Sequence, residues 1–267
     1  MIGVFDSGYG GLTIMKDFIK LLPQYDYCYL GDNARTPYGT RSFETVYRYS
    51  LECVKYLFEE GCKLVILACN TASAKALRSI QQRDLPLLDS QLRVLGVIRP
   101  SAEVIGQYTH SGHVGVLATS GTVQSLSYPI EIKKINPHIQ VFQEACPMWV
   151  PLVENNEYLN DGADYFVRKH IDNLLRQSPD IDAMILACTH YPLLMDKISK
   201  YTPAGVRILS QGDIVAQSLV DYLQRHPEID IKLTKNGLRI FRTSDSPELF
   251  DKYASIFWGE NIKSEKI

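Results

Sequence analysis

The sequence lacks the features by which membrane, exported and nucleic-acid-binding proteins are usually recognised. No apolar run approaches the roughly 20 residues that a membrane-spanning helix needs. The first residues contain no basic segment followed by a long apolar one, so no export signal is predicted and we expect a cytoplasmic protein. The net charge of −2 gives no electrostatic reason to expect a nucleic acid or a membrane as a partner.

Cysteine is present six times, but no two residues form a CxxC pair and none has the histidine spacing of a zinc site. Without an export signal, disulfides are not expected either. We interpret Cys28, Cys53 and Cys62 as small hydrophobic residues in the core, and Cys146 has no evident partner. Two cysteines remain whose surroundings need a different explanation.

Short apolar runs alternate with amphipathic ones along the chain, which is typical of an α/β protein with a mainly parallel sheet. Ser42 is a plausible N-cap for a long amphipathic helix. No low-complexity segment and no long Gly/Ser linker interrupts the pattern. Predicted strands cover 2–5, 27–30 and 64–68, and predicted helices cover 12–22, 43–60 and 72–82.

The strand pattern restarts near residue 113 in the same order. Gly3 and Gly115 lie 112 residues apart in matching strands, and Cys69 and Cys188 lie 119 residues apart. Matching strands at nearly one offset indicate an internal duplication, although apolar strands also resemble one another by chance. A further predicted strand at 207–209 returns the chain to the first pattern.

The two remaining cysteines each end a short apolar run and precede a predicted helix. Ligands of parallel sheets bind at the edge where the strands end. The positive end of a helix that begins there lowers the pKa of a thiol from about 8.5 towards neutrality. His190 could serve Cys188 as an acid/base partner, and Asp6 could serve Cys69. Two thiols that face each other could take a proton from one side of a carbon and return it on the other. The repeated context favours this over two buried, inert thiols.

Two polar loops also follow predicted strands. The glycines of the segment 6–11 could bring backbone N–H groups to an anion, but it lacks the lysine of a P-loop and the GxGxxG spacing of a dinucleotide site. Asp6 could instead be an ordinary N-cap. The Pro-Tyr-Gly turn at 37–39 could aim a backbone N–H and a phenol at a ligand, or be a surface turn.

Together these motifs resemble the glutamate racemases, cofactor-independent enzymes of the aspartate/glutamate racemase superfamily. The similarity runs from near the N-terminus to about residue 195, and QGD at 211–213 continues it. The matching segments are DSGYGGLT at 6–13, YLGDNARTPYG at 29–39, ILACNTASA at 66–74, GVLATSGTVQS at 115–125, CPMWVPLVE at 146–154 and ILACTHYPLL at 185–194.

The resemblance implies a fold and an activity. It implies two similar α/β domains with mainly parallel sheets, related by a pseudo-twofold duplication, with the active site in the inter-domain cleft. The first domain would hold 1–95 and 207–267, and the second 96–206. The implied reaction interconverts L- and D-glutamate and supplies D-glutamate for peptidoglycan and hence for cell shape. No pyridoxal phosphate, metal or nucleotide would be used, and a homodimer is implied.

The resemblance also assigns roles to residues. Cys69 and Cys188 would be the two acid/base thiols, assisted by Asp6 and His190. Asp32 and Glu154 fall on acidic positions that tune these groups. Substrate-contact positions would be Asp6, Ser7, Tyr38, Gly39, Asn70, Thr71, Thr119, Thr122, Thr189 and His190.

Four alternatives remain open from the residues. The same two thiols could racemise another acidic amino acid, chiefly aspartate. A decarboxylase or isomerase of the superfamily often keeps only one thiol, whereas this chain has both. A cysteine hydrolase would leave the second thiol without a role. A catalytically silent binding protein would have no need for the intact set of Cys69, Cys188, Asp6 and His190.

Overall fold

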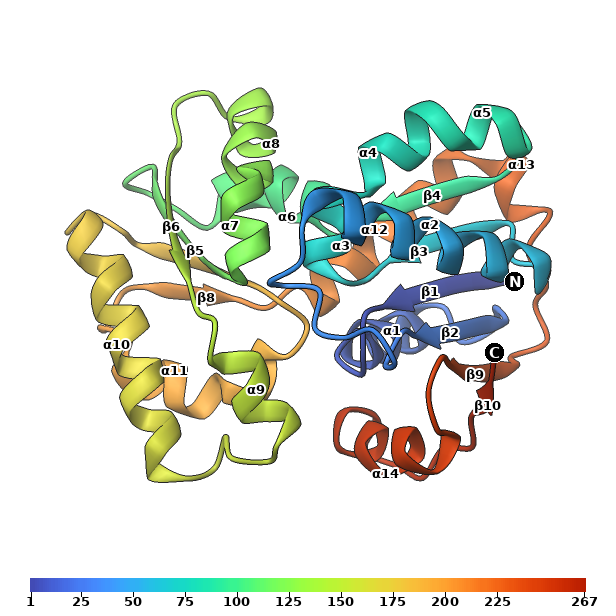
Figure 1. The fold of residues 1–267 in the computed structure, drawn as a ribbon. Helices are drawn as coiled ribbons and strands as arrows, with labels where there is room; N and C mark the ends of the chain where they lie inside the picture. The colour runs from blue at the N-terminus through green and yellow to red at the C-terminus, as the bar shows by residue number, and fades with distance from the viewer. The chain divides into compact units, whose positions relative to one another are not determined.

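A computed structural model describes residues 1–267, and the chain forms two compact α/β units. Unit 1 comprises Met1–Val97 and Gly212–Ile267, and unit 2 comprises Ile98–Gln211 (Figure 1). The chain therefore leaves unit 1 once and returns to it once. The predicted class, two similar α/β domains with parallel sheets, is confirmed.

Unit 1 is built on a six-stranded parallel sheet in the order β10-β9-β2-β1-β3-β4. In the central strand, Gly3 lies opposite Cys28 on one side and Val65 on the other. Every residue of β1 is buried, as expected for a parallel strand covered on both faces. The strands are β1 Ile2–Asp6, β2 Tyr27–Gly31, β3 Leu64–Leu67, β4 Arg93–Gly96, β9 Arg239–Thr243 and β10 Glu265–Lys266.

Two of the longer helices of unit 1, α2 and α14, begin at a capping serine. The Ser42 hydroxyl accepts a hydrogen bond from the Thr45 N–H, and Ser246 does the same for Leu249. The helices are α1 Gly11–Leu21, α2 Phe43–Glu59, α3 Asn70–Lys75, α4 Leu77–Ser79, the π-helix Ile80–Asp84, α5 Leu85–Leu88, α12 Gly212–Arg225, α13 Pro227–Asp230 and α14 Pro247–Trp258.

Unit 2 repeats the arrangement with a four-stranded parallel sheet in the order β6-β5-β7-β8. This is the order of β2-β1-β3-β4 in unit 1, so the duplication is visible in the topology. The strands are β5 His113–Ala118, β6 Gln140–Ala145, β7 Ala183–Ala187 and β8 Arg207–Leu209. The helices are α6 Ile98–Val104, the 3-10 helix Ile105–Gln107, α7 Ser120–Ser125, α8 Ser127–Ile135, α9 Trp149–Glu154, α10 Asp161–Gln177, the 3-10 helix Tyr191–Leu194 and α11 Met195–Tyr201.

Two details differ from the sequence-based expectation. Strand β8 was expected in the first domain, but it pairs in parallel with β7, with Ala183 opposite Arg207. A three-residue strand carries too little pattern to reveal its partner. The helix expected over 72–82 is divided into α3, α4 and a π-helix, with a break at Ala76, whose φ is −115°.

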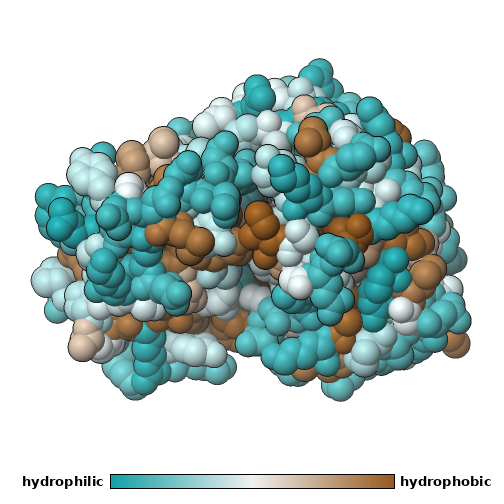
Figure 2. All heavy atoms as spheres, turned by 90° about the horizontal axis from the view of Figure 1, so that it is seen from below, coloured by the Kyte–Doolittle hydropathy of each residue, from teal (hydrophilic) through white to brown (hydrophobic).

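The buried cysteines and the mostly hydrophilic surface agree with what the composition indicates. All six cysteines are free and buried, which confirms Cys28, Cys53 and Cys62 as core residues. Hydrophilic side chains cover most of the face shown in Figure 2, and hydrophobic ones show only in small patches. None of the helices has both the length and the apolar character required to cross a bilayer.

Candidate active site

The predicted site residues lie at the carboxyl edges of the two sheets, meaning the edges at which the strands end. In unit 1, Asp6 ends β1, Asp32 follows β2 and Cys69 follows β3. In unit 2, Cys146 follows β6 and Cys188 follows β7. Because parallel strands end at one edge, each set is gathered where ligands of such sheets bind.

The two thiols occupy equivalent positions in the two sheets. Val65 lies opposite Gly3 of the central strand in unit 1, and Met184 lies opposite Gly115 in unit 2. In each case the cysteine follows four residues later in the sequence. The register of the strands thus reproduces the duplication that the sequence indicated.

Cys69 is the N-cap residue of α3. Its sulfur accepts a hydrogen bond from the Ala72 N–H at 3.4 Å and lies 3.5 Å from the Ser7 hydroxyl. The side chain is almost completely buried. The Ala72 N–H places a donor hydrogen at the sulfur and the Ser7 hydroxyl can supply a second, and such donors stabilise a thiolate.

Asp6 is buried next to the segment that carries the first thiol. Its carboxylate accepts a hydrogen bond from the Gly8 N–H at 3.0 Å. A Cβ atom added to Gly11 would come within 2.6 Å of the Asp6 Cβ and 3.1 Å of the Ala68 Cβ. Only glycine at position 11 therefore lets the start of α1 approach both Asp6 and the residue before Cys69.

Cys188 belongs to a chain of three side chains in unit 2. Its sulfur is 4.0 Å from His190 Nδ1, and His190 Nε2 is 3.0 Å from the Glu154 carboxylate. The Thr189 hydroxyl lies 3.4 Å from the same Nδ1 atom. The structure thus brings Cys188, His190 and Glu154 into contact in that order.

These contacts determine the charge of the imidazole. Burial by itself lowers the pKa of His190, but the neighbouring Cys188 and Glu154 outweigh it and raise the pKa to about 10. At neutral pH the ring is therefore an imidazolium whose Nε2–H donates to Glu154. Its Nδ1 lies on the side of the Cys188 sulfur, so the charged ring faces the thiol.

The setting of Cys188 differs from that of Cys69. No α-helix begins directly after Cys188; Thr189 and His190 follow, and then the short 3-10 helix Tyr191–Leu194. The sequence pattern could not distinguish this turn from an α-helix start. The local positive charge near Cys188 therefore comes chiefly from His190 rather than from a helix end.

Hydroxyl and amide side chains line both edges. In unit 2, the Thr119 hydroxyl caps α7 by accepting from the Thr122 N–H at 3.3 Å, and the two hydroxyls are 3.1 Å apart. In unit 1, Asn70 and Thr71 form the buried first residues of α3. Asn70 and Thr71 directly follow Cys69 in the chain, and Thr119 follows β5, which pairs with the strand β7 that precedes Cys188.

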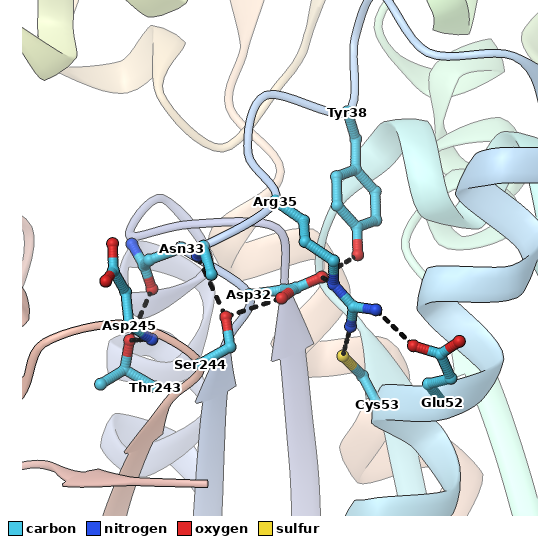
Figure 3. Close-up of polar contacts among 10 residues, drawn as sticks. Asp32, Asn33, Arg35, Tyr38, Glu52, Cys53, Thr243, Ser244 and Asp245 are labelled. Carbon is cyan, nitrogen blue, oxygen red and sulfur yellow. Dashed lines mark hydrogen bonds and ion pairs between the residues drawn. The ribbon is translucent and has the colours of Figure 1, made fainter.

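Asp32 and Tyr38 lie together in a side-chain network on the unit 1 edge (Figure 3). The Tyr38 hydroxyl donates to the Asp32 carboxylate, which also accepts from Arg35 Nε at 2.7 Å and from the Ser244 hydroxyl at 2.7 Å. The phenol thus points to Asp32, whereas Pro37 of the turn is exposed and Gly39 is partly exposed. Sequence reasoning missed Arg35 and Ser244, because Ser244 comes from the far end of the chain.

Cys146 occupies the position in unit 2 that Asp32 occupies in unit 1. It is completely buried, which raises the pKa of its thiol well above the ordinary value, and its sulfur lies 3.8 Å from the Glu144 carbonyl oxygen. Nowhere in the two units do three or more His, Cys, Asp or Glu side chains gather in a way that could hold a metal ion.

The chain is similar over most of its length to known racemases. A family model described as Asp/Glu/Hydantoin racemase matches residues 3–219. The glutamate racemase of Geobacter metallireducens is 41% identical over 261 residues, which cover 98% of this chain and 93% of that relative.

Solved structures extend the similarity to the fold. A glutamate racemase isoform from Bacillus anthracis has a TM-score of 0.90 at 35% identity, covering 100% of this chain and 97% of that one. The glutamate racemase of Francisella tularensis, solved in complex with D-glutamate, has a TM-score of 0.87 at 31% identity, covering 100% and 96%.

Proposed function

Because this chain belongs to the Asp/Glu/hydantoin racemase family, and within it to the glutamate racemases, we propose that it interconverts L- and D-glutamate by a two-thiol mechanism. One observation carries the proposal: Cys69 and Cys188 stand at equivalent positions of two duplicated sheets, each with polar partners at its sulfur. A single-base enzyme would have no use for the second of these thiols.

The proposed reaction moves one proton onto a carbon and another off it. One thiolate takes the α-proton as the C–H bond breaks, and the other thiol gives its proton to the opposite face of the same carbon. Running the reaction from the other enantiomer exchanges the two roles. Since the thiols belong to different units, the mechanism requires both units to contribute to one bound glutamate.

The neighbours of each thiol suit these alternating roles. At Cys188, the imidazolium of His190 faces the sulfur and is held in place by Glu154. At Cys69, the Ala72 N–H and the Ser7 hydroxyl can donate to a thiolate, and Asp6 lies beside the same segment. A thiolate is a far stronger base than a neutral hydroxyl, which explains why Ser or Thr would not serve.

The α-proton of an amino acid is only weakly acidic, so the site must also stabilise the developing carbanion. Backbone N–H groups and hydroxyls that hold the carboxylates in a place without water would do this. Asn70, Thr71, Thr119, Thr122 and Thr189 are the proposed donors. Holding both ends of the glutamate also fixes its Cα between the two sulfurs.

The proposal extends to the physiological context. D-Glutamate is a building block of peptidoglycan, so the product would enter cell-wall synthesis and thereby affect cell shape. The reaction would need no cofactor, because both proton carriers are side chains of the chain itself. We further propose that the protein acts as a homodimer in the cytoplasm.

Proton NMR in D2O tests the function directly. The purified protein is incubated with L-glutamate and then with D-glutamate, without added cofactor, and the α-proton signal and optical rotation are followed. Loss of the signal from both enantiomers, with rotation drifting to zero, is the expected result. Exchange with aspartate but not with glutamate would assign a different substrate to the same mechanism, and no exchange with either would contradict racemisation.

A further inference from the structure

A completely buried carboxylate stands at the carboxyl edge of unit 1 and is fully occupied by protein donors. Asp32 has no exposed surface, and its two oxygens accept from Tyr38, Arg35 and Ser244 (Figure 3). Its backbone N–H donates to the Asp6 carbonyl oxygen at 3.0 Å. Asp32 thus joins the end of β1, the loop that carries Arg35 and Tyr38, and the segment after β9, and it has the contacts of a structural anchor for the site.

Arg35 spans the space between this carboxylate and helix α2. Its Nε–H donates to Asp32, one terminal nitrogen bonds to Glu52, and the other lies 3.4 Å from the Cys53 sulfur. Its guanidinium also stacks 4.3 Å from the centre of the Tyr49 ring. Burial by itself lowers the pKa of Arg35, but the carboxylates of Glu52 and Asp32 raise the pKa by more than burial lowers it. The guanidinium is therefore always charged.

Ser244 connects this network to the C-terminal part of the chain. It follows β9, and its backbone N–H donates to the Gly31 carbonyl oxygen at 3.1 Å. Its hydroxyl donates to Asp32 at 2.7 Å and accepts from the Ala34 N–H at 3.1 Å. One hydroxyl therefore fixes both the carboxylate and the first residues of the loop that leads to the Pro-Tyr-Gly turn.

The Pro-Tyr-Gly turn is fixed by the packing of its tyrosine ring and by a backbone hydrogen bond. The Tyr38 ring is buried and lies 6.2 Å from the Phe5 ring and 5.9 Å from the Tyr49 ring, and its hydroxyl is used by Asp32. The Arg41 N–H donates to the Tyr38 carbonyl oxygen at 3.1 Å, which closes the turn. Pro37 has no N–H, so the N–H that the turn can still offer to a ligand is that of the partly exposed Gly39.

We propose that Arg35 and Ser244 are positioning residues of the active site, which hold Asp32 and, through it, the Tyr38 side chain and the backbone of Gly39, the substrate contact that the family resemblance implies. This inference rests on the proposed racemisation of glutamate. A backbone N–H that binds the side-chain carboxylate of glutamate, which is remote from the α-carbon, does so equally well before and during proton transfer. Its displacement therefore weakens substrate binding more than it slows the chemical step.

Steady-state kinetics of two variants tests the proposal. Ser244→Ala and Arg35→Met are expected to raise the KM for glutamate by about 10-fold and to leave kcat within about two-fold. Ser244→Thr keeps the hydroxyl and should restore the KM. Arg35→Lys should not, because an ammonium group cannot bond to Asp32, Glu52 and Cys53 together.

Matched controls separate positioning from general destabilisation. Arg242→Met removes another half-buried arginine of unit 1 with two carboxylate partners, Glu60 and Glu265, and should leave the KM unchanged. Ser255→Ala removes a hydroxyl that bonds only to the Lys252 carbonyl oxygen of α14 and serves the same purpose. If these controls raise the KM as much as Ser244→Ala does, the proposed role is wrong.

A double-mutant cycle tests the route through Tyr38. Tyr38→Phe removes the hydroxyl that Asp32 holds but keeps the packed ring. Adding Ser244→Ala to Tyr38→Phe should raise the KM by less than about two-fold further, since the two act in one network. Fully additive effects, or a fall in kcat with unchanged KM, would overturn the proposal.

The outcomes remain distinct from a failure of the proposed function. If the wild-type protein exchanges no α-proton of glutamate, the function fails and this inference falls with it. If the wild type is active and folded Ser244→Ala has a normal KM, only the positioning role is refuted. Should Arg35→Met fail to fold, Ser244→Ala and its control still decide the question.

Discussion

Each of the two thiols should be indispensable by itself. Cys69→Ala or Cys188→Ala removes the group that serves one face of the α-carbon, so we expect racemisation in both directions to fall by about 10³-fold or more. Optical rotation of either enantiomer measures the loss. Cys62→Ala, which removes an equally buried thiol from the core, should keep its activity. Substantial turnover in either thiol variant would refute the two-base mechanism.

The charged His190 should make stability depend on pH. Its pKa is about 10 in the folded protein and about 6.5 when unfolded, so the pKa is raised by folding. The stabilisation is therefore complete below about pH 6.5 and is lost as the pH rises through about 10. This shift corresponds to at most about 5 kcal/mol, at about 1.4 kcal/mol per pKa unit.

Denaturant unfolding between pH 6 and 10.5 measures this dependence. His190→Asn should be less stable at pH 6 and should converge with the wild type near pH 10.5. His138→Asn, at an exposed position, should follow the wild type throughout. A constant difference between His190→Asn and the wild type across this range would show that the imidazole is not charged in the folded state.

The sequence revealed those site residues that stand directly after strands. Asp6, Cys69 and Cys188 could be found because apolar strands of parallel sheets end at one edge, and the structure places them there. The partners Arg35 and Ser244 could not be found in this way. Ser244 meets Asp32 across 212 residues of sequence, and only the pairing of β9 with β2 brings them together.

At the level of whole elements, the contact of α10 with β5 depends on the absence of a side chain. A Cβ atom at Gly115 would lie 2.6 Å from Leu174 Cδ2 and 3.2 Å from Leu174 Cγ, and Leu174 is completely buried. We expect Gly115→Ala to lower the free energy of unfolding by about 1–3 kcal/mol, because the core cannot yield. Urea unfolding followed by circular dichroism measures it.

A second glycine of the same region provides the control. Gly162 lies in the first turn of α10, and an added Cβ atom would meet nothing within 4 Å. Gly162→Ala should therefore be neutral or stabilising by up to about 1 kcal/mol. Equal effects at the two glycines would mean that the contact with Leu174 is not what requires Gly115.

Most elements were predictable because their periodicity and caps agree. The helix that Ser42 caps begins where predicted, and the strands ending at Asp6 and before Cys69 lie where the apolar runs indicated. The interruption at Ala76 was not predictable, since the run 72–82 contains neither Gly nor Pro. The partner of β8 was not either, because strand pairing is decided by the whole sheet.

At the level of the whole molecule, we expect both thiols of a site to come from one chain. Cys69→Ala and Cys188→Ala each retain one of the two proposed active-site thiols. A mixture of the two inactive proteins therefore tests this expectation. The two variants are unfolded and refolded either separately or as a mixture. All three samples should be equally inactive towards glutamate. Recovered activity in the mixture would show that two copies of the chain share each site.

The insertion of unit 2 into unit 1 also has a consequence for synthesis on the ribosome. Residues Ile98–Gln211 emerge as one uninterrupted segment with a complete sheet, whereas unit 1 must wait for Gly212–Ile267. Until β9 is translated, the outer edge of β2 has no partner, and such an open edge is prone to pair with other chains. The part of the protein that is made first is thus the last to be finished, and it is the part that a nascent-chain chaperone would have to protect.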